Sequence, residues 1–223
     1  MTLTRKLASE FIGTLGLVAI VVGSGIMAER LSAGNDAVAL LGNSIATGAG
    51  LFVLIYGFSN ISNAHFNPAV TIADMIRRRL APSTGAAYIS AQISGGICGT
   101  MIANLMFTLP IVNMSSKLRA GGGQFLGEFV ATFGLIAVIR LGVRFHPNLV
   151  GALVALYITA AYWFTSSTSF ANPAVTIART LSNTFAGIAP ESVPPFIVAQ
   201  LLGMVSSLLF TEWIFADGDQ TND

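Results

Sequence analysis

The sequence predicts an all-α membrane protein with six transmembrane helices and two short re-entrant half-helices, arranged as an inverted 3+3 repeat. The first observation is composition: of 223 residues, 53% are hydrophobic and only 9% are charged, against about 25% charged residues in a soluble domain. The second is a set of apolar stretches, each close to the roughly 20 residues that cross a bilayer. The third is a motif that occurs once in each half of the chain.

Six apolar stretches form the predicted transmembrane helices. They lie at residues 7–28, 37–58, 83–109, 124–143, 149–168 and 194–216. The first contains Glu10, and we interpret it as a membrane-spanning helix rather than as a cleaved signal peptide. Short polar segments separate the stretches, and residues 115–123 are expected to be no more than a connector.

The internal repeat determines the predicted topology. The sequence NPAVTIA begins at Asn67 and recurs, residue for residue, at Asn172. Weaker matches flank the motif in the same order in both halves: Glu10 with Glu128, and Gln92 with Gln200. Repeat 1 covers approximately residues 1–112 and repeat 2 approximately residues 120–223. Because each half holds three spans, an odd number, the second half enters the membrane from the opposite side.

Each NPA motif predicts a short helix that starts inside the membrane. About ten residues separate each motif from the next polar break, which is too few to span a bilayer. Asn is a favoured N-cap and Pro a favoured first helical residue. Each half-helix is therefore predicted to begin at its motif, formed by Asn67, Pro68 and Ala69 in one half and by Asn172, Pro173 and Ala174 in the other.

Two facing helix starts predict a narrow pore. An inverted repeat brings both starts to the membrane midplane, where each N-terminus carries unpaired N–H groups and about half a positive charge. The side-chain amides of Asn67 and Asn172 are expected to point into the shared cavity and to act as its central filter. The arrangement favours small, uncharged, hydroxylated molecules and excludes protons and metal cations. An alternating-access transporter also uses inverted repeats and broken helices, and it stays open as an alternative.

The composition argues against several other functions. The net charge is +1, with no basic stripe for nucleic acid. One Cys and two His provide no cluster with metal-binding spacing, so we expect no metal and no cofactor. The predicted helices lack a paired nucleophile and base, which disfavours an enzyme. A purely structural junction protein is the remaining alternative of a different class.

Two acidic residues lie within the predicted spans. Glu10 and Glu128 occur about one-third of the way into the first helix of each half, where an ionisable group is costly and usually has a role. We expect each carboxylate to accept hydrogen bonds from the re-entrant backbone of its own half, with a proton relay as the alternative. Gln92 and Gln200 are expected to serve the packing of the third helices.

Basic residues orient the chain, because cytoplasmic loops carry an excess of Lys and Arg. With the N-terminus inside, seven of the 11 basic residues are cytoplasmic: Arg5, Lys6, Arg77, Arg78, Arg79, Arg140 and Arg144. The C-terminus, with the acidic residues Asp217, Asp219 and Asp223, is then cytoplasmic too. We therefore expect a multi-pass protein in the lipid bilayer of the cell membrane.

On these motifs the chain resembles the aquaporin family, the major intrinsic proteins that include water channels and aquaglyceroporins. The resemblance rests on the six spans, the two NPA boxes, the paired Glu10 and Glu128, and the segment AHFNPAVT at residues 64–71. It implies a single channel domain over residues 1–223. It also implies a homotetramer in which each protomer has its own pore, passive flux and no cofactor.

The resemblance also places the outer constriction that sets specificity in this family. Counted from the boxes, its four positions are Thr47, Ala160, Ser169 and Val175. Water-selective members usually have an aromatic residue at the first position, His at the second and Arg at the fourth, and none of these is present. Four small residues imply a wide opening for glycerol, urea or neutral trihydroxy acids such as arsenite, and for water. The absent arginine resembles bacterial channels associated with arsenic detoxification; a water-selective aquaporin is the alternative.

Arg179 follows Val175 by four residues and so shares its helix face. We expect its guanidinium to reach back over the outer vestibule and to replace part of the missing cation barrier. The alternative is an arginine in contact with solvent or lipid headgroups.

Two residues of the first half complete the candidate site. His65 precedes the first NPA box and is a candidate polar group near the cytoplasmic end of the pore. Asp74, the counterpart of Arg179, is expected to pair with Arg77 or Arg78.

Overall fold

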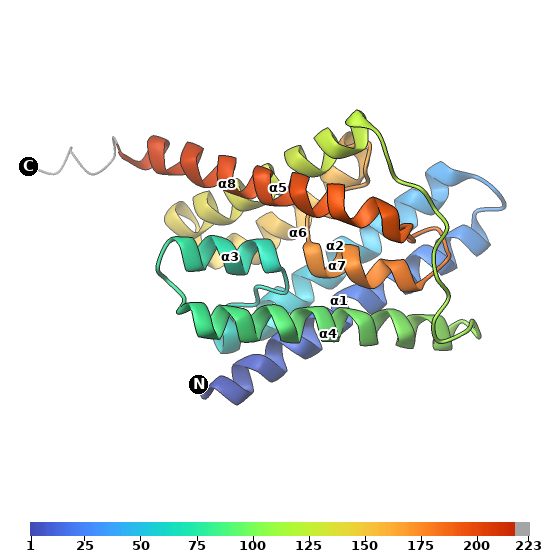
Figure 1. Cartoon of the computed structure of the whole chain (residues 1–223), viewed down its shortest axis with the longest axis horizontal. Helices are drawn as coiled ribbons and strands as arrows, with labels where there is room; N and C mark the ends of the chain where they lie inside the picture. Colours follow the sequence, from blue (N-terminus) through green and yellow to red (C-terminus); the bar gives the residue numbers. More distant parts are fainter. Residues whose placement is uncertain (217–223) are drawn as a thin grey trace, which may run out of the picture.

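The structure, a computed structural model that describes residues 1–216, is a bundle of long helices around two short ones (Figure 1). The long helices are α1 (Leu3–Leu31), α2 (Asp36–Ser62), α4 (Pro82–Met106), α5 (Gly122–Phe145), α6 (Val150–Phe164) and α8 (Val193–Ala216). The short ones are α3 (Pro68–Ile76) and α7 (Pro173–Ala178), and 3-10 turns cover Pro147–Leu149, Arg179–Leu181 and Pro190–Ser192. The predicted fold class is confirmed. The acidic residues Asp217, Asp219 and Asp223 lie outside the described residues.

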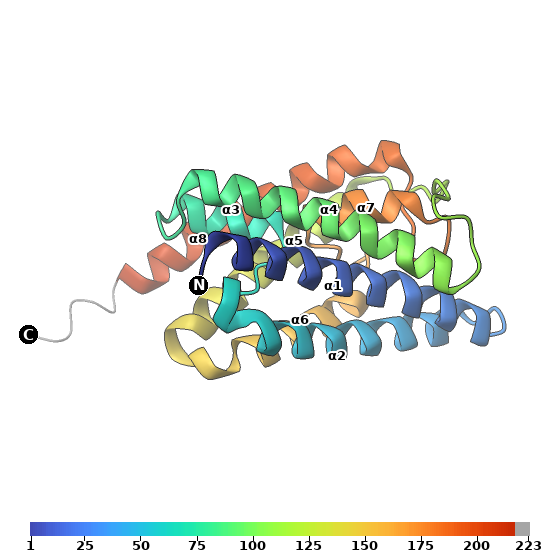
Figure 2. The ribbon, with the colours of Figure 1, turned by 90° about the horizontal axis from the view of Figure 1, so that it is seen from below.

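Each half of the described chain packs in the same way. Helix α1 packs against α2 and α4, and α5 packs against α6 and α8. Figure 2 shows α1, α2 and α4 running side by side. The half-helices α3 and α7 each pack against both α4 and α8, and they contact each other. They lie roughly end to end in Figure 1, so the two NPA motifs meet in the middle of the bundle.

Helix α4 differs from the other long helices in composition. Five helical segments of the described chain are long and apolar enough to cross a membrane, and α4 is not among them although it has 25 residues. Its polar residues, which include Gln92 and Asn104, lower the hydropathy. Its glycines permit close packing, because a Cβ on Gly95 would overlap the carbonyl oxygen of Phe11. In the other half, a Cβ on Gly203 would overlap the carbonyl oxygen of Phe129 in the same way. Small residues at such crossings are typical of membrane helices.

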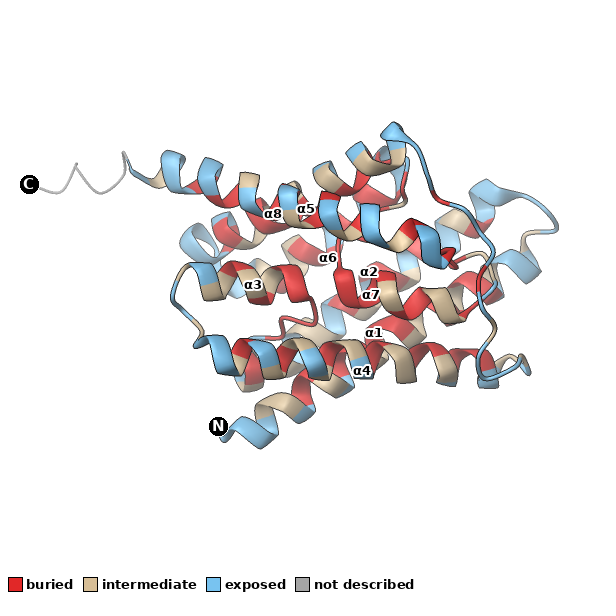
Figure 3. Cartoon of the chain, viewed as in Figure 1, coloured by how far each residue is buried: buried red, intermediate tan, exposed pale blue. Residues whose placement is uncertain are grey.

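Polar and apolar side chains are distributed as expected for a protein in lipid. The outward faces of the long helices are exposed (Figure 3), and they carry large apolar residues such as Val53, Leu156 and Leu209. Glu10 and Glu128, by contrast, are fully buried. Because so much apolar surface would be unfavourable in water, the chain is a multi-pass membrane protein.

Candidate functional site

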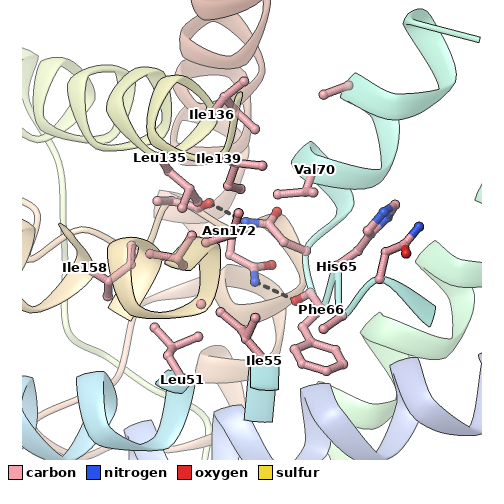
Figure 4. Close-up of a pocket in the computed structure, with 18 of the residues that line it drawn as sticks. Leu51, Ile55, His65, Phe66, Val70, Leu135, Ile136, Ile139, Ile158 and Asn172 are labelled. Carbon is pink, nitrogen blue, oxygen red and sulfur yellow. Dashed lines mark hydrogen bonds between the residues drawn. The ribbon is translucent and has the colours of Figure 1, made fainter. Parts of the chain in front are cut away.

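A cavity of about 920 Å³ runs through the bundle past both half-helices. One end, the Arg77 end, is lined by Asp74, Arg77, Arg79, Arg140 and Arg144. The other, the Arg179 end, is lined by Thr47, Tyr162, Ser169, Val175 and Arg179. Asn67 and Asn172 lie between the ends. Apolar side chains that include Leu51, Ile55, Leu135 and Ile158 line the same part of the cavity, and Figure 4 shows them around Asn172. The passage thus combines a few polar groups with largely apolar walls.

Each half-helix begins at the Asn of its motif, as predicted. Asn67 Oδ1 accepts a hydrogen bond from the backbone N–H of Ala69 at 2.9 Å. Asn172 Oδ1 accepts from Ala174 at 3.0 Å and from Val175 at 3.3 Å. The proline that follows each Asn is the first helical residue. Because Pro has no N–H to leave unpaired, this sequence starts a helix sharply.

The two Asn side chains also join the two halves. Asn67 Nδ2 donates to the carbonyl oxygen of Ala171 at 2.8 Å, and Asn172 Nδ2 donates to that of Phe66 at 2.8 Å. Figure 4 shows the bond from Asn172 to Phe66. Each amide nitrogen carries two hydrogens, so one N–H of each Asn remains for a molecule in the cavity that both residues line.

The loops before the two motifs have the same strained backbone. Phe66 and Ala171 have φ of 48° and 47°, and Ala64 and Ser169 have φ of 49° and 50°. This left-handed conformation costs about 1–3 kcal/mol for a residue with a side chain, and it persists only where the surroundings enforce it. Here this conformation turns the carbonyl oxygens of Phe66 and Ala171 toward the side-chain amides that donate to them.

Glu10 holds the first loop in this conformation. Its carboxylate accepts hydrogen bonds from four donors: Ser62 Oγ at 2.6 Å, His65 N at 3.0 Å, Phe66 N at 2.8 Å and Gln92 Nε2 at 2.7 Å. Gln92 Nε2 also donates to Thr71 Oγ1 of α3 at 2.9 Å. The carboxylate therefore fixes the loop, and Gln92 connects it to the half-helix.

Glu128 repeats this arrangement in the second half. It accepts from Phe170 N at 2.8 Å, Ala171 N at 2.9 Å and Gln200 Nε2 at 2.6 Å. Gln200 Nε2 also donates to Thr176 Oγ1 of α7 at 2.9 Å. Gln92 and Gln200, which we expected to serve the packing of the third helices, also join a buried carboxylate to a half-helix.

At the Arg179 end, three of the four expected constriction residues line the cavity. Thr47, Ser169 and Val175 are buried and contribute to its wall. Tyr162, which the sequence did not single out, lies there as well, and its hydroxyl is 3.1 Å from Thr47 Oγ1. This end therefore has one more hydroxyl group and one more aromatic ring in its wall than the four predicted residues supply.

The assignment of Ala160 to the constriction is wrong. Ala160 is exposed on the outside of α6, whereas Ile158 and Tyr162 line the cavity. Residues two apart on a helix point about 200° apart, so Ala160 faces away from the passage. Helix α6 also ends at Phe164 rather than at 168, because the chain then turns into the loop before the second motif.

Arg179 is buried at the cavity wall, with 2% of its surface exposed. Its Nε donates to the carbonyl oxygen of Ala186, and its guanidinium carbon lies 3.4 Å from the centre of the Phe170 ring. The alternative of a solvated arginine is therefore wrong for this chain.

Residues 115–123 do more than connect two helices. Arg119 from this segment is buried, and its guanidinium carbon lies 4.9 Å from the centre of the Phe170 ring. Arg119 Nε donates to the carbonyl of Gly187 at 2.9 Å, and Lys117 Nζ donates to that of Phe185 at 2.9 Å. Burial lowers the pKa of Lys117, and the positive charge of Arg119 adds to this effect; burial likewise lowers the pKa of Arg119 to about 10.

Three successive backbone carbonyls thus accept hydrogen bonds from three cationic side chains. Phe185, Ala186 and Gly187 supply the acceptors. In the described chain, no carboxylate forms an ion pair with the three cations, which are Lys117, Arg119 and Arg179. The Arg179 end is consequently electropositive.

At the Arg77 end, His65 and Asp74 form a pair. His65 Nε2 lies 3.3 Å from Asp74 Oδ2, and His65 Nδ1 lies 3.1 Å from Thr71 Oγ1. The expected pairing of Asp74 with Arg77 or Arg78 is wrong: among residues 1–216 the ion-pair partner of Asp74 is His65, and Arg77 Nε contacts Glu212 Oε1 at 3.3 Å.

No group of three His, Cys, Asp or Glu residues within residues 1–216 is placed to hold a metal ion.

Comparisons with known proteins identify relatives of the chain. The family model described as Major intrinsic protein matches residues 1–165. The chain is 54% identical over 212 residues to Aquaglyceroporin AqpS of Rhizobium meliloti (strain 1021), and the match covers 95% of this chain and 91% of that protein. It is 31% identical over 195 residues to Aquaporin NIP2-1 of Oryza sativa subsp. japonica, covering 83% of this chain but only 64% of that relative.

A solved structure shares the fold. It is an X-ray structure of the aquaglyceroporin from Plasmodium falciparum, with a TM-score of 0.75, 21% sequence identity, and coverage of 94% of this chain and 95% of that one.

Proposed function

Because the chain belongs to the major intrinsic protein family, we propose that it is a passive channel for glycerol-sized neutral solutes and for water, and that it excludes protons and ions. Membership of this family points to a channel for small solutes rather than to an enzyme. The name of the bacterial relative, an aquaglyceroporin, favours solutes larger than water.

One observation carries the proposal: a continuous cavity passes two Asn side chains that each keep one free amide hydrogen. These hydrogens offer donors to the oxygen of a solute, and the positive ends of the two half-helix dipoles favour that oxygen. The apolar walls provide no replacement for the hydration shell of an ion, so a neutral hydroxylated molecule crosses at much lower cost than an ion does.

The Arg179 end supports passage of solutes larger than water. Val175 provides no charge and little bulk at the position where the family resemblance places the arginine of water-selective members. Ser169, Thr47 and Tyr162 supply hydroxyl groups around it. Glycerol and neutral trihydroxy acids such as arsenite, which are similar in size and in their hydroxyl groups, both suit this opening.

Ion exclusion is assigned to two places. The facing N-termini of α3 and α7 repel cations at the centre, and Arg179 repels them at its own end. Glu10 and Glu128 hold the loops in place, and His65 lines the opposite end. We further propose that the Arg77 end is cytoplasmic, that residues 1–223 form one channel domain, and that the protein is a homotetramer in the cell membrane.

Stopped-flow light scattering of proteoliposomes tests this function. We expect glycerol flux well above that of empty liposomes, nearly proportional to the gradient and weakly dependent on temperature. Saturation at micromolar solute with a steep temperature dependence would instead indicate an alternating-access transporter. Flux at the background level would indicate a structural protein.

A further inference from the structure

At the Arg179 end, the cavity contains more hydrogen-bond donors than neighbouring groups use. Arg179 Nε donates to the carbonyl oxygen of Ala186, but its two terminal nitrogens have no acceptor among residues 1–216. The buried hydroxyl of Ser169 also has no hydrogen-bond partner in this part of the chain. Both residues line the cavity. Leaving the buried Ser169 hydroxyl unpaired is costly, and the terminal nitrogens of Arg179 are not among the buried atoms that lack a partner. Both groups are therefore available to a ligand in the cavity that accepts hydrogen bonds.

The charges around this end favour an anion as that ligand. Arg119 and Lys117 lie nearby with only carbonyl and hydroxyl acceptors. The buried carboxylate of Glu128 is occupied by two backbone N–H groups and Gln200. Glu29, an exposed acid at the rim, accepts from Phe185 N at 3.1 Å. The positive charge of Arg179 is therefore not neutralised by an ion pair in the described chain.

Arg179 is also held in a geometry that suits an oxyanion. Phe170 covers a face of its guanidinium at 3.4 Å, and the bond to Ala186 fixes Nε. The remaining edge is a rigid fork of N–H groups, which matches two oxygens of one anion. Because Arg179 is buried at the cavity wall, a small dissolved anion can reach it and a lipid headgroup cannot.

We propose that the Arg179 end contains a binding site for a small oxyanion, formed by Arg179 and Ser169. A bound anion stays at this end, because the cavity beyond Val175 is walled largely by apolar residues such as Ile158 and Leu51, and desolvating a charge there is costly. It occupies the path of neutral solutes. The site therefore makes the proposed flux sensitive to oxyanions on the Arg179 side.

Direct binding is the first test and does not depend on flux. Isothermal titration of the detergent-solubilised full chain with inorganic phosphate, at constant ionic strength set with NaCl, is expected to show saturable binding. Arg179→Gln is expected to weaken it by about tenfold or more, because it removes the charged donors. Ser169→Ala is expected to weaken it by a smaller factor. Arg30→Gln, which removes an exposed positive charge outside the cavity, is the matched control and is expected to leave binding unchanged.

Glycerol flux then tests whether the oxyanion site lies in the path of neutral solutes. In proteoliposomes, external phosphate is expected to lower glycerol flux through the parent and to have little effect on Arg179→Gln. Absence of saturable binding, or equal binding by the parent and Arg179→Gln, would overturn the proposal. Binding without inhibition would overturn its location in the solute path. Glycerol flux at background with phosphate binding intact would refute only the channel function.

Discussion

Asn172 donates its side-chain amide to the carbonyl of Phe66 at 2.8 Å, and Phe66 holds that carbonyl in place with a left-handed backbone. Likewise, Asn67 donates its side-chain amide to the carbonyl of Ala171, whose backbone is also left-handed. The central filter is therefore one unit, in which each motif positions the other. Its stability depends on the buried carboxylates that fix the two strained loops.

Replacing either carboxylate by an amide tests this dependence. In Glu10→Gln or Glu128→Gln, an amide NH₂ faces backbone N–H donors, so we expect about 1–3 kcal/mol of lost stability and a large loss of glycerol flux. Thermal unfolding in detergent and stopped-flow flux measure the two effects. Glu191→Gln, at an exposed site, is the control. Normal glycerol flux with loss of proton movement alone would favour the proton relay instead.

Removing the Arg179 charge tests the cation barrier. Arg179→Ala is expected to raise proton or cation leak by about tenfold, equivalent to ~1.4 kcal/mol of barrier. A pH-sensitive dye inside proteoliposomes measures the proton leak. Arg30→Ala removes a charge outside the cavity and should behave as the parent does. A leak in Arg179→Ala no larger than in the parent would refute the barrier.

Tyr162 lines the cavity whereas Ala160 faces outward from α6, so substitutions at the two positions should have different effects. Tyr162→Ala enlarges the Arg179 end, so we expect higher permeability to polyols larger than glycerol. Ala160→Val changes an outward-facing position and should leave the solute preference unchanged. Stopped-flow measurements with glycerol and larger polyols compare the two. If Ala160→Val alters the preference and Tyr162→Ala does not, the assignment of the cavity wall is incorrect.

Local signals made the half-helices predictable from sequence. Asn followed by Pro determines a helix start through its own side chain and the missing N–H, and both predicted starts are observed. The buried acids were also recognisable, because Glu10 and Glu128 stand out in apolar spans. The bonds they form with the loop backbone are as expected.

Contacts between distant segments were not predictable. Arg119 bonds to Gly187, 68 residues away, and no local pattern distinguishes it from an arginine in a connector. Counting back from the second motif places Ala160 in the constriction, but such a count cannot account for a helix that ends at Phe164. One signal was available: Ile158 and Tyr162 are four residues apart and so share a helix face.

The glycerol-to-water permeability ratio of Val175→Arg tests the central claim most directly. An arginine at this position adds bulk and donors where the opening is held to be wide, and Val175→Leu is the control that adds bulk without charge. We predict that the ratio falls by about tenfold in Val175→Arg, equivalent to ~1.4 kcal/mol of added barrier for glycerol, and by less in Val175→Leu. A ratio that is unchanged or higher in Val175→Arg would contradict the account.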